Sequence, residues 1–369
     1  MRFRLVLVGF GRVAQNLAKI LIEKRTHLKR QFDFDYKVVA VVDTIKGSAM
    51  RQSGLHLERL LSLAQERGSI KDYPEGTTGL SAIETIARTD ADVLVEATWT
   101  NLEDGEPGLS HIRKALSKGL HVVTTNKGPI ALAYHELAAL ARRRRCHLRF
   151  EGTVLSGTPA ISLATEALAG STINSIRGIL NGTANYILDE MAAGRTYTQA
   201  LKTAQELGYA EADPSSDVEA WDSAAKITIL VNVLMGGRIK PTDVRRQGIT
   251  GITPEDIGDA RTKGERIRLV ANAYRDKDRI RAQVIPERLE ESDLLSHVSG
   301  VLNAMILSTD VQPEVAVVGP GAGGESAGYA LLSDLLALNR TLKDPSRIQD
   351  VFHSNQTAYR RKPMNVRRL

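Results

Sequence analysis

A strand-like run that passes through a glycine turn into a helix is the feature that most constrains the fold. Residues 4–8 have the apolar pattern of a buried strand, and Leu17, Ile20 and Leu21 follow at helical spacing. Between them lies a G-x-G-x-x-A turn, made of Gly9, Phe10, Gly11, Arg12, Val13 and Ala14. The first glycine of such a turn allows a sharp bend, the second lets the backbone approach a pyrophosphate, and the helix N-terminus receives the phosphate charge. An ordinary strand–helix turn is the alternative, but the strand and helix that the motif requires are both present. The six residues are therefore predicted to bind a dinucleotide.

The second predicted strand, residues 37–42, ends at Asp43. An acid at this place accepts hydrogen bonds from the adenosine ribose, which favours NAD. Lys46 lies just beyond and could instead meet the 2′-phosphate of NADP, while Asp43 could also be only a turn residue. The spacing from the glycines exceeds the usual ~20 residues, and a polar insertion at residues 24–36 accounts for the excess. We expect NAD or NADP as cofactor, with NAD favoured.

Strands and helices alternate as far as residue 150, which predicts a Rossmann-type, doubly wound parallel sheet in an α/β protein. Two of the strands, residues 92–97 and 121–123, are followed by polar residues. Ligands bind at the carboxyl ends of such strands. Thr98, Thr100, Asn126 and Lys127 are therefore predicted to line the cofactor site.

Beyond residue 150 the alternation stops, and a mixed order of helices and strands predicts a second, α+β domain. We expect a dinucleotide-binding domain at 1–150, completed by residues 311–340. A substrate-binding domain is expected at 151–310, and a tail or return element at 341–369. The length of 369 residues suits two domains or three small ones.

The charge of the chain raises the question of nucleic acid, because 49 Lys and Arg residues exceed 43 Asp and Glu residues. The main basic cluster, residues 142–145, follows a helical pattern and lacks interleaved aromatic residues for base stacking. It is interpreted as a solvated helix end, and no nucleic-acid partner is expected. No apolar run of about 18 residues predicts a membrane span. Cys146 is the only cysteine, which excludes a disulfide framework, and the chain start does not resemble a signal peptide. We expect a cytoplasmic protein.

Asp222 and Lys226 form the most promising chemical pair. They are four residues apart on a predicted helix and hence on one face. The simplest interpretation is a helix salt bridge worth only a few tenths of a kcal/mol. However, residues 227–233 are mostly apolar, so that Lys226 is expected to be partly desolvated and suited to acid–base work.

Four segments, together with the glycine turn, resemble the homoserine dehydrogenase family in the order of that family. They are residues 125–129, 178–187, 208–226 and 319–324. The resemblance covers about residues 1–340 and points to a short form with neither a kinase segment nor a C-terminal regulatory domain. The sequence departs from the family pattern at Ala220, where glycine is common, at Trp99, and at Ala327 and Gly328, where Thr-Ala is commoner.

The resemblance implies the NAD(P)-dependent interconversion of L-homoserine and L-aspartate 4-semialdehyde, in threonine, methionine and isoleucine biosynthesis. It assigns proton transfer to Lys226, a second active-site role to Lys127 at the cofactor and substrate, and a supporting role to Asp222. It places Glu211 against the substrate ammonium and Asp217 in the same pocket.

Three further properties are implied only by the resemblance. Gly323, in the last glycine run, would contact the cofactor. A sodium ion is expected at the hinge, held by Glu151 with main-chain oxygens near Val154, Ser156 and Thr158. A homodimer is expected through the second domain.

Two other functions stay open from the sequence: another NAD(P)-dependent amino-acid dehydrogenase, and a regulator that binds NAD(H) without turnover. A regulator would need a DNA-binding or partner module, and no such segment is found. A Tyr-x-x-x-Lys pair is absent, which argues against short-chain reductases, and Cys146 lacks the context of a thioester-forming nucleophile.

Overall fold

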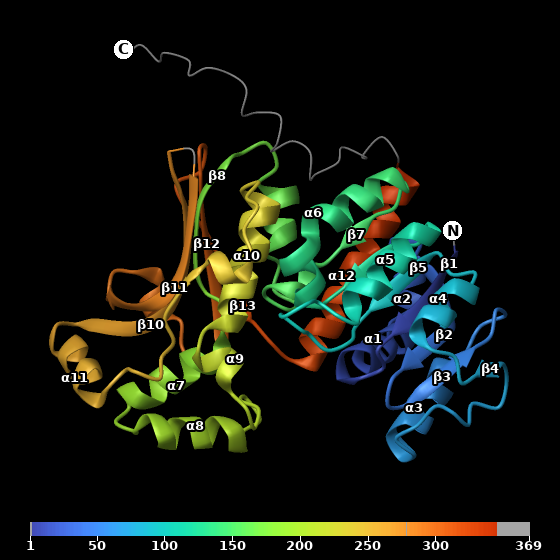
Figure 1. Cartoon of the computed structure of the whole chain (residues 1–369), viewed down its shortest axis with the longest axis horizontal. Coiled ribbons are helices and arrows are strands. Elements are labelled where there is room, and N and C mark those ends of the chain that lie inside the picture. Colours follow the sequence, from blue (N-terminus) through green and yellow to red (C-terminus); the bar gives the residue numbers. More distant parts are fainter. Residues whose placement is uncertain (1, 278, 345–369) are drawn as a thin grey trace, which may run out of the picture.

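Two β-sheets, each with its own helices, stand side by side in the computed structural model of this chain (Figure 1). The structure describes residues 2–277 and 279–344. Helix α10 (Trp221–Leu234) lies between the second sheet and α6 (Lys127–Arg143) of the first half. In this described part of the chain, no helix combines the length and apolar character that crossing a membrane requires.

The first sheet has the strand order β4-β3-β2-β1-β5-β6-β7. Its strands are β1 (Arg2–Val8), β2 (Asp35–Asp43), β3 (Gly47–Met50), β4 (Thr77–Thr78), β5 (Val93–Glu96), β6 (His121–Thr124) and β7 (Leu148–Arg149). Strands β2, β1, β5, β6 and β7 are parallel, and β3 and β4 extend the edge in antiparallel pairs. The accompanying helices are α1 (Arg12–Glu23), α2 (Arg25–Phe32), α3 (Leu57–Glu66), α4 (Ala82–Arg88), α5 (Gly108–Lys118) and α6. Because both faces are covered, central residues such as Leu5, Val6 and Leu7 are wholly buried.

The second sheet has the order β13-β12-β8-β10-β11-β9 and is antiparallel except for the β9–β11 pair. Its strands are β8 (Ile173–Ile179), β9 (Arg245–Arg246), β10 (Glu265–Asp276), β11 (Arg279–Glu290), β12 (Leu302–Thr309) and β13 (Val315–Pro320). Its helices are α7 (Gly182–Ala192), α8 (Tyr197–Glu206), α9 (Ser215–Val218), α10 and α11 (Pro254–Thr262). Short helical turns are η1 (Glu151–Thr153), η2 (Leu163–Ala167), η3 (Pro241–Asp243) and η4 (Leu294–His297).

The last described helix, α12 (Gly324–Lys343), returns to the first half and packs along α1. Leu17 and Leu21 of α1 share a core with Leu331 and Leu335 of α12. At Gly328 a Cβ atom would lie 2.9 Å from the main-chain nitrogen of Leu17, so the glycine permits this close approach.

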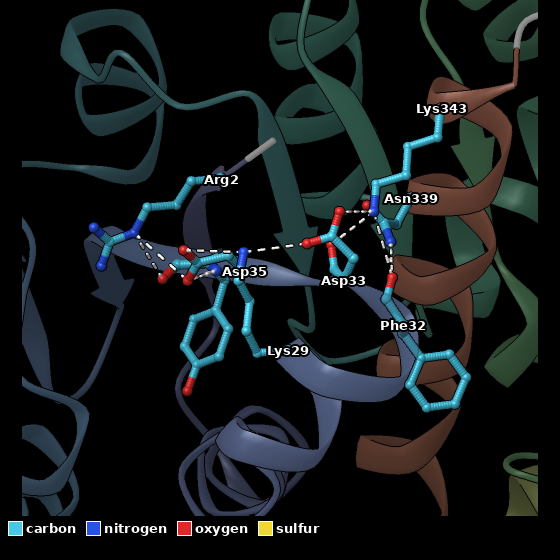
Figure 2. Close-up of polar contacts among 8 residues, drawn as sticks. Arg2, Lys29, Phe32, Asp33, Asp35, Asn339 and Lys343 are labelled. Carbon is cyan, nitrogen blue, oxygen red and sulfur yellow. Dashed lines mark hydrogen bonds and ion pairs between the residues drawn. The ribbon is translucent and has the colours of Figure 1, made fainter.

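Polar contacts hold the end of α12 against the end of α2 (Figure 2). Lys343 Nζ donates to the main-chain oxygen and to a carboxylate oxygen of Asp33, both at 2.7 Å. Asn339 Nδ2 donates to the main-chain oxygen of Phe32 at 3.0 Å. Hydrogen bonds from Lys343 and Lys29 lower the pKa of Asp33 to about 2.

The expected α/β class, with a Rossmann-type sheet and a second α+β region, is confirmed. Three details differ from the predictions. The polar insertion at 24–36 contains helix α2, which buries only Leu28. Residues 315–320 pair with β12 in the second sheet, so the return to the first half starts at α12 rather than at residue 311. Residues 341–343 continue α12, and the expected tail beyond residue 344 lies outside the described residues.

Candidate active site

The glycine turn has the shape that a dinucleotide needs. Gly9 has a φ of 84°, and a Cβ atom there would lie 2.5 Å from the main-chain oxygen of Ala97, so no side chain fits. Gly11 is the N-cap of α1, so no side chain caps the first N–H groups of this helix. The space that a Cβ atom of Gly11 would occupy is open. Phe10 and Ala14 bury their side chains in the core, which leaves their backbone at the turn. The start of α1 can therefore receive an anion.

A cavity of about 560 Å³ opens between the first turns of α1 and α12. It is lined by Arg12, Gln15, Asn16, Lys19 and residues 322–326. Two predicted cofactor residues, Arg12 and Gly323, are thus brought together from distant parts of the sequence. Val13, on the same turn of α1, is half-buried.

Asp43 ends β2 beside the glycine turn and holds two turns together. Its Oδ2 accepts the Phe10 N–H at 2.7 Å, and its Oδ1 accepts the N–H groups of Ile45 and Lys46 at 3.0 and 2.9 Å. The turn role considered for Asp43 is therefore present. A carboxylate has further lone pairs, so Asp43 can also accept a hydrogen bond from a ribose hydroxyl.

Thr98 and Asn126 meet at the carboxyl ends of β5 and β6. Asn126 Nδ2 donates to Thr98 Oγ1 at 3.2 Å and to the main-chain oxygen of Trp99 at 3.0 Å. Its Oδ1 accepts the Gly128 N–H at 3.1 Å and so caps α6. Thr100 is exposed beyond them. Beneath them lies Glu96, which is not among the predicted site residues, although an acid at the end of an apolar strand is a signal for one.

Lys127, Asp222 and Lys226 meet where the two halves of the chain face each other. Lys127 is the first residue of α6, and the other two lie one turn apart on α10. Asp222 Oδ1 is 3.1 Å from Lys127 Nζ, and Asp222 Oδ2 is 2.7 Å from Lys226 Nζ. Lys226 Nζ also donates to the main-chain oxygen of Leu180 at 2.6 Å. One carboxylate is thus shared by two ammonium groups.

Burial and neighbouring charge have opposite effects on the pKa of each lysine, and a different effect is larger at each one. Burial lowers the pKa of Lys226, against the attraction of Asp222. The charge of Asp222 raises the pKa of Lys127, which is one-quarter exposed. Burial alone would raise the pKa of Asp222, but the two ammonium groups hold this pKa well below its usual range. Lys226 is therefore the more acidic lysine of the pair.

Asn181 joins a further acid to this cluster. Its Nδ2 donates to Asp217 Oδ1 at 2.6 Å and to Asp222 Oδ2 at 2.9 Å, while its Oδ1 caps α7 through the Ala184 N–H. Burial, and then the nearby Asp222, raise the pKa of Asp217. Glu211 is exposed at the rim, where its charge also favours the charged form of Lys127. Asn181 lies in residues 178–187, one of the four segments that carry the family resemblance. Its distance along the sequence from Asp217 and Asp222 gave no indication that it bonds to both.

The hinge segment at 151–158 has its own buried polar groups. The Glu151 carboxylate accepts the N–H groups of residues 160, 161 and 162 at 2.6, 2.9 and 2.8 Å, so its side chain caps the next turn. Ser156 has a φ of 54°, and its buried Oγ makes no hydrogen bond. Thr158 Oγ1 donates to the main-chain oxygen of Pro320 at 3.1 Å. Within residues 2–277 and 279–344, no three acidic, His or Cys side chains converge on a metal site. A cation at this hinge would therefore rely on the main-chain oxygens of Val154 and its neighbours.

Family models and known proteins match this chain along most of its length. Residues 9–151 match the model for the NAD binding domain of homoserine dehydrogenase, and residues 159–336 match the homoserine dehydrogenase model. An NAD(+)-dependent homoserine dehydrogenase of Pseudomonas canavaninivorans is 42% identical over 340 residues, covering 92% of this chain and 97% of the relative. The homoserine dehydrogenase of Methanocaldococcus jannaschii is 42% identical over 340 residues, covering 92% and 99%.

Solved structures give the same result. A putative homoserine dehydrogenase from Archaeoglobus fulgidus superposes with a TM-score of 0.83 at 39% identity, covering 91% of this chain and 99% of that one. A hyperthermophilic archaeal homoserine dehydrogenase in complex with NADPH gives a TM-score of 0.79 at 29% identity, covering 94% and 99%.

Proposed function

The chain belongs to the homoserine dehydrogenase family of NAD(P)-dependent oxidoreductases, and we propose that Lys226 transfers the proton in its reaction while Lys127 assists as a second active-site lysine. The reaction interconverts L-homoserine and L-aspartate 4-semialdehyde. The observation that supports the proposed roles is the Asp222 carboxylate, shared between Lys127 Nζ at 3.1 Å and Lys226 Nζ at 2.7 Å. Each half of the chain contributes one of the two lysines.

Each lysine has a distinct task at the substrate oxygen. When NAD(P) is bound, its nicotinamide exchanges the hydride with carbon 4 of the substrate. Lys226 donates a proton to the oxygen during reduction and takes it back during oxidation, and burial makes its ammonium a stronger acid than an exposed one. Lys127 stays charged beside Asp222 and stabilises the negative charge that develops on the oxygen.

The proposed substrate contacts lie around this pair. Glu211 binds the ammonium of the amino acid from the rim, and Asp217 shapes the same pocket through Asn181. The residues that would hold the cofactor are those of the glycine turn with Asp43, Thr98, Thr100, Asn126 and Gly323. The open space at Gly11 supports this placement.

The test is formation of NAD(P)H from L-homoserine by the purified chain, followed by Lys226→Ala. A positioned acid–base group contributes roughly 10²–10⁴-fold, so kcat should fall by that factor while NADH binding is kept. Lys202→Ala is the control, because Lys202 is an exposed lysine on α8. Near-normal kcat in Lys226→Ala would refute the assigned role. Turnover of other amino acids but not homoserine would favour another dehydrogenase, and NADH binding without any turnover would favour a regulator.

We further propose that NAD works at least as well as NADP. An acid at the end of β2 repels a 2′-phosphate, although Lys46 is close by and could pair with one. The Asp43 carboxylate beside the Phe10 N–H supports the proposal, because it faces the glycine turn.

A sodium ion at the hinge is also proposed, held by Glu151 with main-chain oxygens near Val154, Ser156 and Thr158. It would neutralise carbonyl dipoles and stiffen the hinge without taking part in the reaction. The buried, unpartnered Oγ of Ser156 supports a missing polar partner there. A rise of Tm in sodium chloride over choline chloride at equal ionic strength would test it, and equal Tm values would refute it.

We propose a cytoplasmic homodimer that pairs through the face of the second sheet turned away from α10. Tyr274 and Val318 are 43% and 54% exposed on that face, and large apolar side chains favour burial. Light scattering should give twice the chain mass of 40.3 kDa. Val318→Glu should give the monomer mass, whereas Val311→Glu, in an exposed turn, should leave the dimer intact. A monomeric wild-type chain would refute the dimer.

The proposed cytoplasmic location rests on the single cysteine of the chain, which suits a reducing compartment.

A further inference from the structure

Glu96, the last residue of β5, is an acid buried without any exposed surface. Its Oε1 accepts the Thr98 N–H at 3.1 Å and the Thr98 hydroxyl, and its Oε2 accepts the Thr124 hydroxyl at 3.0 Å. The Nδ1 atom of His111, also buried, lies 3.7 Å from Oε1. A buried carboxylate is costly unless it is satisfied in this way, so its presence calls for a function.

The charge of Glu96 fixes the direction of the hydrogen bonds around it. An ionised carboxylate only accepts, so both threonine hydroxyls must point their hydrogens at Glu96. Their lone pairs are then left to accept from Asn126. The Asn126 N–H donates to Thr124 Oγ1 at 3.0 Å, and Asn126 Nδ2 donates to Thr98 Oγ1 at 3.2 Å. With Nδ2 so engaged, Asn126 Oδ1 is the atom that turns to the Gly128 N–H and caps α6.

The next residue after this cap is Lys127, whose Nζ reaches Asp222 across the junction of the two halves. The chain of contacts therefore runs from a buried acid in the first sheet to the lysine that meets the substrate. We propose that Glu96 is a positioning residue for Lys127: its negative charge orients Thr98, Thr124 and Asn126, and thereby sets the start of α6. This inference rests on the proposed role of Lys127.

Glu96→Gln tests the proposal, because it keeps the shape and removes the charge. The glutamine amide would donate to one of the two threonine oxygens, which would reverse that hydroxyl and disturb the cap. A small misplacement of a catalytic group costs up to roughly 10²-fold, so kcat for semialdehyde reduction is expected to fall by about tenfold or more. Glu103→Gln is the matched control, because Glu103 is an exposed acid in the loop after β5, and it should keep wild-type kcat.

A double-mutant cycle separates positioning from mere loss of folded enzyme. In a Lys127→Ala background, Glu96→Gln should change kcat by less than about twofold, because the group it positions is gone. A purely structural role would lower kcat by the same factor in both backgrounds and would overturn the inference. Unchanged kcat in Glu96→Gln alone would overturn it as well.

Two further outcomes are distinguishable. If Glu96→Gln does not fold, Thr124→Val replaces it in the double-mutant cycle with Lys127→Ala. This change removes the hydroxyl between Glu96 and Asn126 and keeps the side-chain shape. If Lys127→Ala itself keeps wild-type kcat, the proposed role of Lys127 fails and this inference fails with it. If Lys127→Ala loses activity but Glu96→Gln and Thr124→Val do not, only this inference fails.

Discussion

Asp222 shows at the residue scale how one carboxylate can give two lysines different acidities. Its charge favours the ammonium form of both neighbours, and burial offsets this effect chiefly at Lys226. Asp222→Asn removes the attraction, so the pKa of Lys226 should fall further. Because Lys226 is proposed to donate the proton during reduction, the high-pH limit of kcat in that direction should move to lower pH. The pH–rate profile measures the shift, with the exposed Asp90→Asn as control. A limit that stays in place would mean that another group sets it.

Glu211 should act on substrate affinity more than on rate. A carboxylate that meets the substrate ammonium contributes equally in the ground and transition states. Glu211→Gln should therefore raise KM for homoserine, by about tenfold for a lost charged hydrogen bond, with kcat little changed. Steady-state kinetics at saturating NAD measure this effect. Glu206→Gln, an exposed change on α8, should leave KM unaltered, and an unaltered KM in Glu211→Gln would remove this residue from the pocket.

Asp43 should influence the choice of cofactor. Asp43→Ser removes the charge that repels a 2′-phosphate and leaves Lys46 available to pair with it, so the NADP/NAD ratio of kcat/KM should rise. Both cofactors must be titrated at fixed homoserine and fixed salt, because ions screen phosphate recognition. A ratio that does not move would mean that Asp43 serves only the turns that it caps with Phe10, Ile45 and Lys46.

At the scale of elements, the predicted helix that holds Asp222 and Lys226 is α10, and it is separated at Ala220 from the short helix α9 before it. Ala220 has a φ of 65°, in the left-handed region that favours glycine, which gives a physical reason for the glycine common at this place in the family. The break turns the first residues of α10 so that Asp222 and Lys226 face Lys127.

The strain at Ala220 predicts a stabilising substitution. A left-handed alanine costs roughly 1–2 kcal/mol, and the extra backbone entropy of glycine offsets about 0.4–1 kcal/mol of the gain. Ala220→Gly should therefore raise Tm slightly, as followed by circular dichroism. Ala139→Gly, in the part of α6 that follows its kink at Ala133, should lower it, because glycine costs about 1 kcal/mol inside a helix. A lower Tm for Ala220→Gly would show that the methyl packing at this buried site outweighs the strain.

Long apolar elements and local motifs could be predicted from the sequence, but contacts between distant segments could not. The strand–turn–helix at Gly9 and the Asp222–Lys226 pair follow from spacing alone. Helix α2 has a mostly polar sequence, and its end is held by Lys343 and Asn339 of α12, which spacing cannot indicate. The link between Asp222 and Lys127, and the partners of Asn181 and Glu96, depend on how the two halves meet.

At the scale of the whole molecule, Asp334 of α12 joins the halves at the hinge. Its Oδ2 accepts the Glu151 N–H at 2.9 Å. Burial raises its pKa to about 8 from an ordinary value of 3.8, with Arg149 opposing the rise and Glu151 and Glu166 adding to it. Between these values the folded chain binds the proton and the unfolded chain does not, so stability falls as the pH rises.

Asp334→Asn should remove this pH dependence, because asparagine keeps an accepting oxygen and cannot ionise. Its Tm should equal or approach that of the wild type near pH 5 and exceed it above pH 8. Thermal unfolding across this range measures the difference, and Glu23→Gln, an exposed change on α1, should follow the wild-type curve. A parallel offset of the Asp334→Asn curve at every pH would show that Asp334 is ionised in the folded chain.

The return of α12 to α1 also determines when the molecule can be completed during synthesis. Leu17 and Leu21 leave the ribosome early, but Leu331 and Leu335, which cover them, emerge only after the whole second sheet has been made. Until α12 has been made, these apolar residues of α1 therefore stay uncovered in the nascent nucleotide-binding half. We expect the packing of α12 against α1 to be a late step of folding.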